Sequence, residues 1–186
     1  MNKEAYYRSI AEVVASRSKC LSRKIGAVLV KDDSIISTGY NGPPRGIPHC
    51  GSERLAYDNT LKTALFEWPK TSGVMCPRRV LGAESGERLD ICPATHAEAN
   101  AIVQAAKTGV STEGSTMYLT CEVPCKSCLG LIINAGIKKV VYNTRILCDG
   151  KPEMFYDDVS RFIVDNSDLE VTTYETSCFK SPLEGR

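Results

Sequence analysis

The order of predicted elements indicates an α/β protein with a mixed five-stranded sheet and helices on both faces. A helix at 3–17 precedes two strands at 25–31 and 34–40, after which helices and strands alternate. Such alternation is typical of parallel strands covered by helices on both faces. Because only Asp32 and Asp33 separate the first two strands, these strands are predicted to form an antiparallel hairpin. The result is a three-layer α/β/α fold.

Each element is predicted from periodicity and from residues that end helices. The first helix is supported by apolar residues at helical spacing, namely Tyr6, Ile10, Val13 and Val14. The next clear helix, 97–107, is rich in alanine and is followed by Gly109. The remaining predictions are helices at 126–135 and 153–164 and strands at 115–120, 137–143 and 169–175.

Residues 1–186 are predicted to form one domain with an insertion at about 51–92. The insertion lacks sustained periodicity, although 53–68 could include a helix. The preceding segment, NGPPRGIP at 41–48, is dense in glycine and proline and is predicted to be a loop. The final eleven residues are predicted to be a loose tail.

The composition argues against several classes of protein. The 23 basic and 22 acidic residues give a net charge of +1, whereas extended nucleic-acid binders usually present a basic face. No run approaches the roughly 18 apolar residues of a membrane span, and no secretory signal is evident. We therefore expect a cytoplasmic protein, or host-cytoplasmic if viral, without a membrane or extended nucleic-acid partner.

The 9 cysteines are many for a chain of 186 residues. In a reducing compartment disulfides rarely persist, so clustered cysteines are better explained as metal ligands or buried thiols. The odd number also fits a complete disulfide framework poorly.

Two short motifs carry the predicted chemistry. His96-Ala97-Glu98 and Pro124-Cys125-Lys126-Ser127-Cys128 each open a predicted helix. One imidazole and two thiolates, from His96, Cys125 and Cys128, give Zn²⁺ three protein ligands and leave the fourth position for water, as in catalytic sites. Glu98 cannot easily bind the same ion together with His96, but it can stand beside the water and move protons.

Each motif alone is weak evidence, because structural zinc knuckles and redox pairs also contain C-x-x-C. Together they are specific, since H-x-E followed by P-C-x-x-C is the signature of zinc nucleobase deaminases. The competing interpretation is a purely structural zinc site.

HAEANAI (96–102) and VPCKSC (123–128) resemble the cytidine deaminase superfamily. SRKIGAVLV (22–30), STGYNGPPRGIPHC (37–50) and NAGIKKVVY (134–142) narrow the resemblance to deoxycytidylate (dCMP) deaminases of bacteria and their viruses. The resemblance implies the cytidine deaminase-like fold and hydrolysis of dCMP to dUMP, which supplies dTMP synthesis. It also implies that zinc-activated water attacks C4 and that Glu98 relays the protons.

Further site residues follow from the resemblance. The backbone at Ala97 is expected to contact the pyrimidine edge, and Asn41 the sugar or phosphate. A plain turn residue is the alternative for Asn41. Candidate contacts for the phosphate are Ser22, Arg23 and Lys24, with Arg45 as another cation, although charged loop residues are often simply solvated.

The resemblance also implies a homohexamer that dCTP activates and dTTP inhibits. The expected effector site lies in the loop 39–46, because backbone N–H groups of a glycine-rich loop can approach phosphate. Its candidate residues are Gly39, Tyr40, Gly42 and Arg45. An ordinary turn at the hairpin exit is the competing explanation.

Four further cysteines, Cys20, Cys50, Cys76 and Cys92, lie outside the catalytic motifs. The hairpin would bring the first two together, and Cys92 stands four residues before His96. Four such thiols would make a closed structural zinc site that orders the insertion. The resemblance supports this, because some viral dCMP deaminases bind a second zinc through cysteines matching Cys20 and Cys50. His49 is a rival fourth ligand, and four ordinary thiols are the alternative.

Other functions remain open at this point. A related deaminase could act on cytidine, dCTP or adenosine in transfer RNA, although the near-neutral charge disfavours the last. A protein of another class, a non-catalytic zinc-stabilised nucleotide-binding module, would have no need of Glu98.

Overall fold

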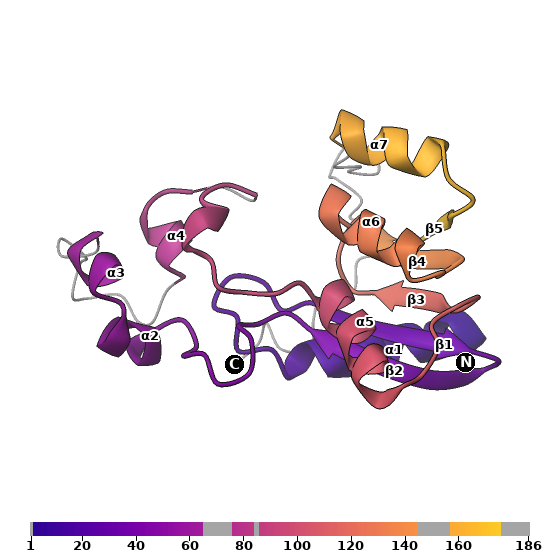
Figure 1. The fold of residues 1–186 in the computed structure, drawn as a ribbon, viewed down its shortest axis with the longest axis horizontal. Helices are drawn as coiled ribbons and strands as arrows, with labels where there is room; N and C mark the ends of the chain where they lie inside the picture. Colours follow the sequence, from indigo (N-terminus) through magenta and orange to yellow (C-terminus); the bar gives the residue numbers. More distant parts are fainter. Residues whose placement is uncertain (1, 65–75, 84–85, 145–156, 176–186) are drawn as a thin grey trace.

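The computed structural model describes residues 2–64, 76–83, 86–144 and 157–175. Its elements are α1 (Lys3–Ser16), β1 (Gly26–Lys31), β2 (Ser34–Tyr40), α2 (Ser52–Tyr57), α3 (Asn59–Ala64), α4 (Pro77–Val80), a 3-10 helix (Leu89–Ile91), α5 (Ala97–Thr108), β3 (Thr116–Leu119), α6 (Lys126–Asn134), β4 (Lys139–Thr144), α7 (Asp158–Asp165) and β5 (Glu170–Glu175). The α/β fold is confirmed (Figure 1).

The strands form one sheet in the order β2-β1-β3-β4-β5. β1 runs antiparallel to β2 and β3, whereas β3, β4 and β5 are mutually parallel. At the hairpin Asp32 and Asp33 have φ values of 47° and 59°, the left-handed conformation that a two-residue turn of this kind requires. The mixed five-stranded sheet is therefore confirmed.

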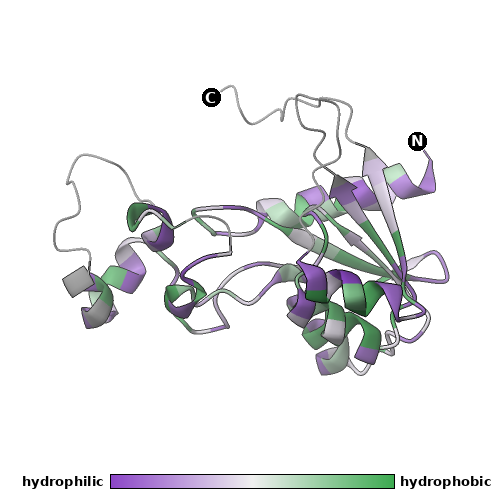
Figure 2. Ribbon diagram, turned by 90° about the horizontal axis from the view of Figure 1, so that it is seen from above, coloured by the Kyte–Doolittle hydropathy of each residue, from purple (hydrophilic) through white to green (hydrophobic). Residues whose placement is uncertain are grey.

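Side chains of β1 alternate between two cores, one on each face of the sheet. Ala27 and Leu29 belong to the larger core, which includes buried residues of α5 and α6. Val28 and Val30 pack on the other face, against Tyr7 and other residues of α1. Figure 2 shows the apolar residues concentrated on the strands and on the helices packed against them. Helices thus cover both faces, as predicted.

The first helix ends one residue before the predicted limit, and of the apolar residues expected on its buried face only Ile10 and Val14 pack against the core. Tyr7, Ala11 and Ala15 are buried, whereas Tyr6 and Val13 are 51% and 70% exposed. The reason is a close approach to the sheet, because a Cβ on Gly26 would lie 2.2 Å from the Ala11 carbonyl oxygen. At such a distance only small helix residues fit.

A second close approach positions α5. A Cβ on Gly39 of β2 would lie 2.3 Å from both the Ala97 oxygen and the Ala101 nitrogen. Just beyond β2, Gly42 and Thr95 exchange backbone hydrogen bonds of 3.1 and 2.8 Å. The start of α5 is therefore fixed against β2 and the segment that follows it.

The insertion between β2 and α5 contains short helices that lie away from the sheet (Figure 1). The helix expected within 53–68 is present as α2 and α3, and 65–75 lies outside the described residues. The helix expected at 153–164 is α7, which ends one residue later; 153–156 and the tail lie outside the description. In the part of the chain that is described, no helix combines the length and the apolar character needed to cross a membrane.

The packing of Gly39 generates a stability prediction. Gly39→Ala forces a methyl group into the α5 backbone and should lower the free energy of unfolding by about 1–3 kcal/mol, as overpacking does. Gly130→Ala is the matched control, because nothing lies within 4 Å of a Cβ there. That change in the middle of α6 should instead stabilise the protein by up to about 1 kcal/mol. Urea unfolding measures both, and wild-type stability of Gly39→Ala would contradict the packing argument.

Candidate active site

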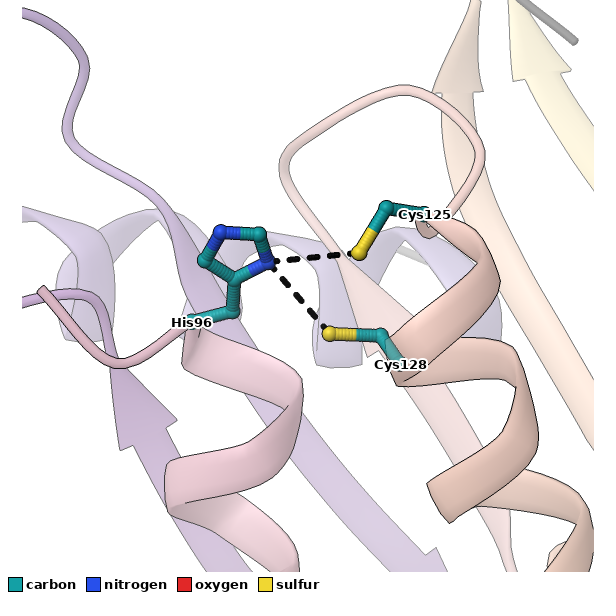
Figure 3. A group of neighbouring side chains, drawn as sticks. All are labelled: His96, Cys125 and Cys128. Atoms are coloured by element: carbon teal, nitrogen blue, oxygen red, sulfur yellow. Dashed lines mark hydrogen bonds between the residues drawn. The ribbon is translucent and has the colours of Figure 1, made fainter. Parts of the chain in front are cut away.

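Two helix N-termini present the predicted metal ligands. His96 is the N-cap of α5, and Cys125 is the N-cap of α6. Cys128 follows in the first turn of α6 and is buried, whereas His96 and Cys125 are exposed. Figure 3 shows the three side chains pointing toward one another from the two helices. Helix N-termini favour negative charge and so favour thiolates at this place.

The spacing of the three ligand atoms fits zinc. Nδ1 of His96 lies 3.4 Å from Sγ of Cys128 and 3.6 Å from Sγ of Cys125. A tetrahedral ion with Zn–N of 2.0–2.1 Å and Zn–S of about 2.3 Å separates N and S by about 3.5 Å. Among the described residues, these three form the one group of potential ligand atoms that all lie within 4.8 Å of one another. The donor set and its geometry thus match a catalytic zinc site with one open position.

Glu98 lies in the first turn of α5, beside this group, and is 4% exposed. Burial raises the pKa of its carboxyl, while the backbone hydrogen bond and the charge of His96 oppose the rise. A carboxyl whose pKa moves upward toward neutrality can both take and return a proton. This is the property expected of the proton-transferring group.

Of the two thiols, Cys125 loses its proton readily and Cys128 retains its proton. Hydrogen bonds from Cys128 and His96 lower the pKa of Cys125 to about 3. The hydrogen bond that Cys128 gives to Cys125 raises the pKa of Cys128. The hydrogen bond with Cys125 likewise raises the pKa of His96. Without metal, negative charge is therefore concentrated on the exposed Cys125.

Most of the predicted substrate residues lie near the N-terminal end of β1. Asn41 is 7% exposed, and its Oδ1 accepts from the Ile25 N–H at 2.8 Å. Its Nδ2 donates to the Arg23 carbonyl at 2.8 Å, so Asn41 joins the chain after β2 to the chain before β1. Ser22 and Lys24 are exposed. The remaining candidate, Ala97, is the first residue of α5, next to His96, and is fully buried.

The predicted effector residues have varied surroundings. Gly39 is buried against α5, which gives it a packing role. The carbonyl of Tyr40 accepts from Asn100 at 2.8 Å, and Gly42 pairs with Thr95. Arg45 is exposed and donates to Gln104 at 3.1 Å. The loop is thus tied to α5 at several points.

The second set of cysteines is brought around one cavity but not to metal-ligand spacing. Cys20, Cys50, Cys76 and Cys92, together with His49, line a cavity of about 40 Å³. No three of their ligand atoms lie within 4.8 Å of one another. Burial raises the pKa of Cys50, against the lowering effect of a hydrogen bond from Arg54. Arg54 also donates to the Ile91 carbonyl next to Cys92, so it joins two parts of the cavity wall.

Three residues that contact or adjoin the predicted site residues were not themselves predicted to have a role. The Ser18 hydroxyl donates to the Asn41 carbonyl at 2.7 Å and accepts from the Cys20 N–H at 3.1 Å. Glu122 forms an ion pair with Arg23. Cys121, expected to have no role, is buried close to Glu98, and burial raises its pKa. Only Glu122 carried a sequence signal, as an acid next to the P-C-x-x-C motif. Cys148 and Cys178 lie outside the described residues.

The low pKa of Cys125 predicts an unusual pH profile for alkylation. In metal-free protein, iodoacetamide should modify Cys125 at a nearly constant rate between about pH 5 and 8, because the thiolate is already formed. An ordinary thiol would react about tenfold faster per pH unit over that range. Cys121, which is buried, is the internal control and should remain unmodified. Peptide mass spectrometry with and without added zinc measures both, and a steep pH dependence at Cys125 would contradict the assignment.

Comparison with known proteins agrees with this geometry. The sequence profile of the cytidine and deoxycytidylate deaminase zinc-binding region matches residues 1–144. The deoxycytidylate deaminase of Enterobacteria phage T4 is 39% identical over 173 residues, which cover 87% of this chain and 84% of that protein. The deoxycytidylate deaminase of Schizosaccharomyces pombe is 34% identical over 142 residues, 76% of this chain but only 37% of that longer protein.

Solved structures point the same way. A dCMP deaminase from the cyanophage S-TIM5, in complex with dCMP and dUMP, has a TM-score of 0.57 and 28% sequence identity. The alignment covers 92% of this chain and 96% of the cyanophage protein. The matched region of this chain, residues 1–144, contains the three residues of the site in Figure 3, as well as Glu98. The chain therefore belongs to the cytidine and deoxycytidylate deaminase family, whose members are hydrolytic deaminases.

Proposed function

We propose that this protein is a zinc-dependent deaminase that hydrolyses dCMP to dUMP and so supplies dUMP for dTMP synthesis. The observation that carries the proposal is the group of His96, Cys125 and Cys128 beside the buried carboxyl of Glu98. A purely structural zinc site has no use for such a carboxyl next to an open coordination position. The relatives named deoxycytidylate deaminase support the choice of substrate.

Each residue of the site has a distinct task in this reaction. His96, Cys125 and Cys128 would hold one Zn²⁺, which supplies an activated water when bound. Glu98 takes a proton from that water, delivers one to N3 of the cytosine ring, and assists the departure of ammonia from C4. Its burial suits the task, since the raised pKa brings it closer to the groups with which it exchanges protons.

We assign the substrate contacts to Ala97, at the start of α5, and to residues near the N-terminal end of β1. The backbone at Ala97 would contact the pyrimidine edge. An amide NH₂ has two donors, and the bond from Asn41 to Arg23 uses one of them, so we assign the other to the sugar or phosphate. The exposed Ser22 and Lys24, and Arg23 between them, are the candidates for the phosphate.

Regulation and assembly form a further part of the proposal. We assign dCTP as activator and dTTP as inhibitor, both acting at the loop that contains Gly39, Tyr40, Gly42 and Arg45. The hydrogen bonds from this loop to α5 support the assignment, because a ligand there would act directly on the helix that carries Glu98. A homohexamer in the cytoplasm, host cytoplasm if viral, completes the proposal.

We also propose that a second, structural zinc orders the insertion within a single domain. The four thiols Cys20, Cys50, Cys76 and Cys92 share one cavity of about 40 Å³. A volume of that size exceeds the roughly 10–15 Å³ needed to hold a water molecule, so an ion can enter. Because the sulfurs are not yet at ligand spacing, binding must draw them inward, and this couples metal affinity to the folding of the insertion. His49, on the same cavity, is the rival fourth ligand.

Glu98→Gln tests the reaction. The variant should retain the catalytic zinc but lose dCMP deamination by a factor of about 10²–10⁴, the usual contribution of a general acid–base group. Ultraviolet absorbance follows dCMP loss, and metal analysis follows zinc. Glu113→Gln, on an exposed turn, is the control and should retain activity. Full activity of Glu98→Gln would overturn the mechanism.

The same assay decides the substrate. Cytidine, CMP and dCTP are compared with dCMP, each with and without dCTP as effector. If zinc-replete protein deaminates none of them, the protein acts as a nucleotide-binding module or on another base.

The second zinc predicts a stoichiometry. Metal analysis should find about two zinc ions per chain in the wild-type protein and about one in Cys76→Ser, since a site of three sulfurs binds more weakly. Cys121→Ser is the matched control and should retain both ions, because Cys121 does not line the second cavity. One zinc per wild-type chain would remove the second site. Loss of one zinc ion in His49→Ala, but not in Cys76→Ser, would make His49 the fourth ligand.

A further inference from the structure

One ion pair joins the segment just before β1 to the loop that precedes α6. Arg23 and Glu122 form this pair, and their side chains are 36% and 15% exposed. The two residues lie 99 positions apart in the sequence. An ion pair that is partly shielded from solvent is less screened by salt than one at the open surface. The contact can therefore hold the two segments in a fixed position relative to each other.

The Arg23 end of the pair is fixed. The Arg23 carbonyl accepts from Nδ2 of the buried Asn41, as described above. Two residues further along, the Ile25 N–H donates to the same amide. The next residue, Gly26, exchanges hydrogen bonds with Thr120, one through the backbone at 3.1 Å and one through the threonine hydroxyl at 2.9 Å. The guanidinium thus extends from a segment held at consecutive points.

The Glu122 end belongs to the loop that presents a zinc ligand. This loop leaves β3 after Leu119 and ends at Cys125, the N-cap of α6. β4 holds its beginning, through a 3.0 Å hydrogen bond from the Asn143 N–H to the Cys121 carbonyl. Glu122 follows immediately and stands three residues before Cys125. Cys125 is exposed, so its position depends strongly on its loop.

We propose that Arg23 is a positioning residue that acts through Glu122 on the loop of Cys125, and that it does not bind the substrate phosphate. This inference rests on the proposed function only for the substrate, because the effect on the metal ligands is independent of it. The guanidinium is already engaged by a carboxylate, so the pair as a whole offers little net charge to an anion. Of the three candidate contacts for the phosphate, Lys24 and Ser22 then remain.

The metal test uses the chemistry of Cys125 itself. Zinc-loaded protein is exposed to a chelator together with iodoacetamide, and the rate of Cys125 modification reports the loss of the catalytic zinc. Glu122→Gln and Arg23→Gln should each accelerate this modification about five- to tenfold, and the double variant should add little, as expected when both changes remove one interaction. Glu170→Gln is the matched control, because it breaks the Lys139–Glu170 ion pair between β4 and β5 and should leave the rate unchanged.

A kinetic test separates positioning from phosphate binding. If Arg23 positions the loop, Arg23→Gln and Glu122→Gln should lower kcat by a similar factor and change KM for dCMP less than about twofold. The exchanged pair, Arg23→Glu with Glu122→Arg, should restore part of the zinc retention. A large rise in KM for Arg23→Gln alone, with wild-type zinc retention, would overturn the inference and make Arg23 a phosphate ligand.

The outcomes distinguish this inference from the proposed function. If the wild-type protein does not deaminate dCMP, the proposed function fails, but the rate of Cys125 modification still tests the role of the ion pair. If Arg23→Gln does not fold, Glu122→Gln provides the same measurement with a side chain of equal size. Unchanged zinc retention in Glu122→Gln overturns the inference.

Discussion

The close contact between α5 and β2 at Gly39 is the constraint on which the rest of the site depends. With no Cβ at this position, the helix backbone lies directly on the strand, and its first residues have almost no freedom to shift. His96 and Glu98 stand at the beginning of this helix. The hydrogen bonds between Gly42 and Thr95 fix the chain just before it. The metal ligand and the proton carrier are consequently placed by backbone contacts, which side-chain fluctuations disturb little.

The site also shows how differing exposure divides the chemical tasks among neighbouring groups. Glu98 and Cys128 are buried, and Cys125 and His96 are open to solvent. Burial disfavours the charged form of a carboxyl, whereas hydrogen bonds to an exposed thiolate favour its charge. The arrangement keeps a proton available at Glu98 while Cys125 is ready to bind a cation. Burial thus favours the protonated form of Glu98, whereas hydrogen bonds favour the thiolate form of Cys125.

Much of this could be predicted from the sequence, and the failures have a common cause. The alternation of elements, the Asp32-Asp33 turn and the H-x-E and P-C-x-x-C motifs are local signals, and each led to the observed element or site. The buried face of α1 was predicted only in part: Ile10 and Val14 pack against the core as expected, whereas Ala11 and Ala15 are weakly apolar and are selected only by the approach to Gly26. The contact of Ser18 with Asn41 and the ion pair of Arg23 with Glu122 join distant segments, so no local pattern encodes them.

The paired backbone of Gly42 and Thr95 has a consequence for how the protein can vary. The segment between these two residues contains α2, α3 and α4, and the hydrogen bonds bring its two ends together. The entropy of closing a flexible loop grows only slowly with length, by about 0.6 kcal/mol for each doubling. Lengthening or shortening between the two ends therefore costs little and leaves His96 in place. A change in the size of this segment would thus leave the catalytic centre next to it unaltered.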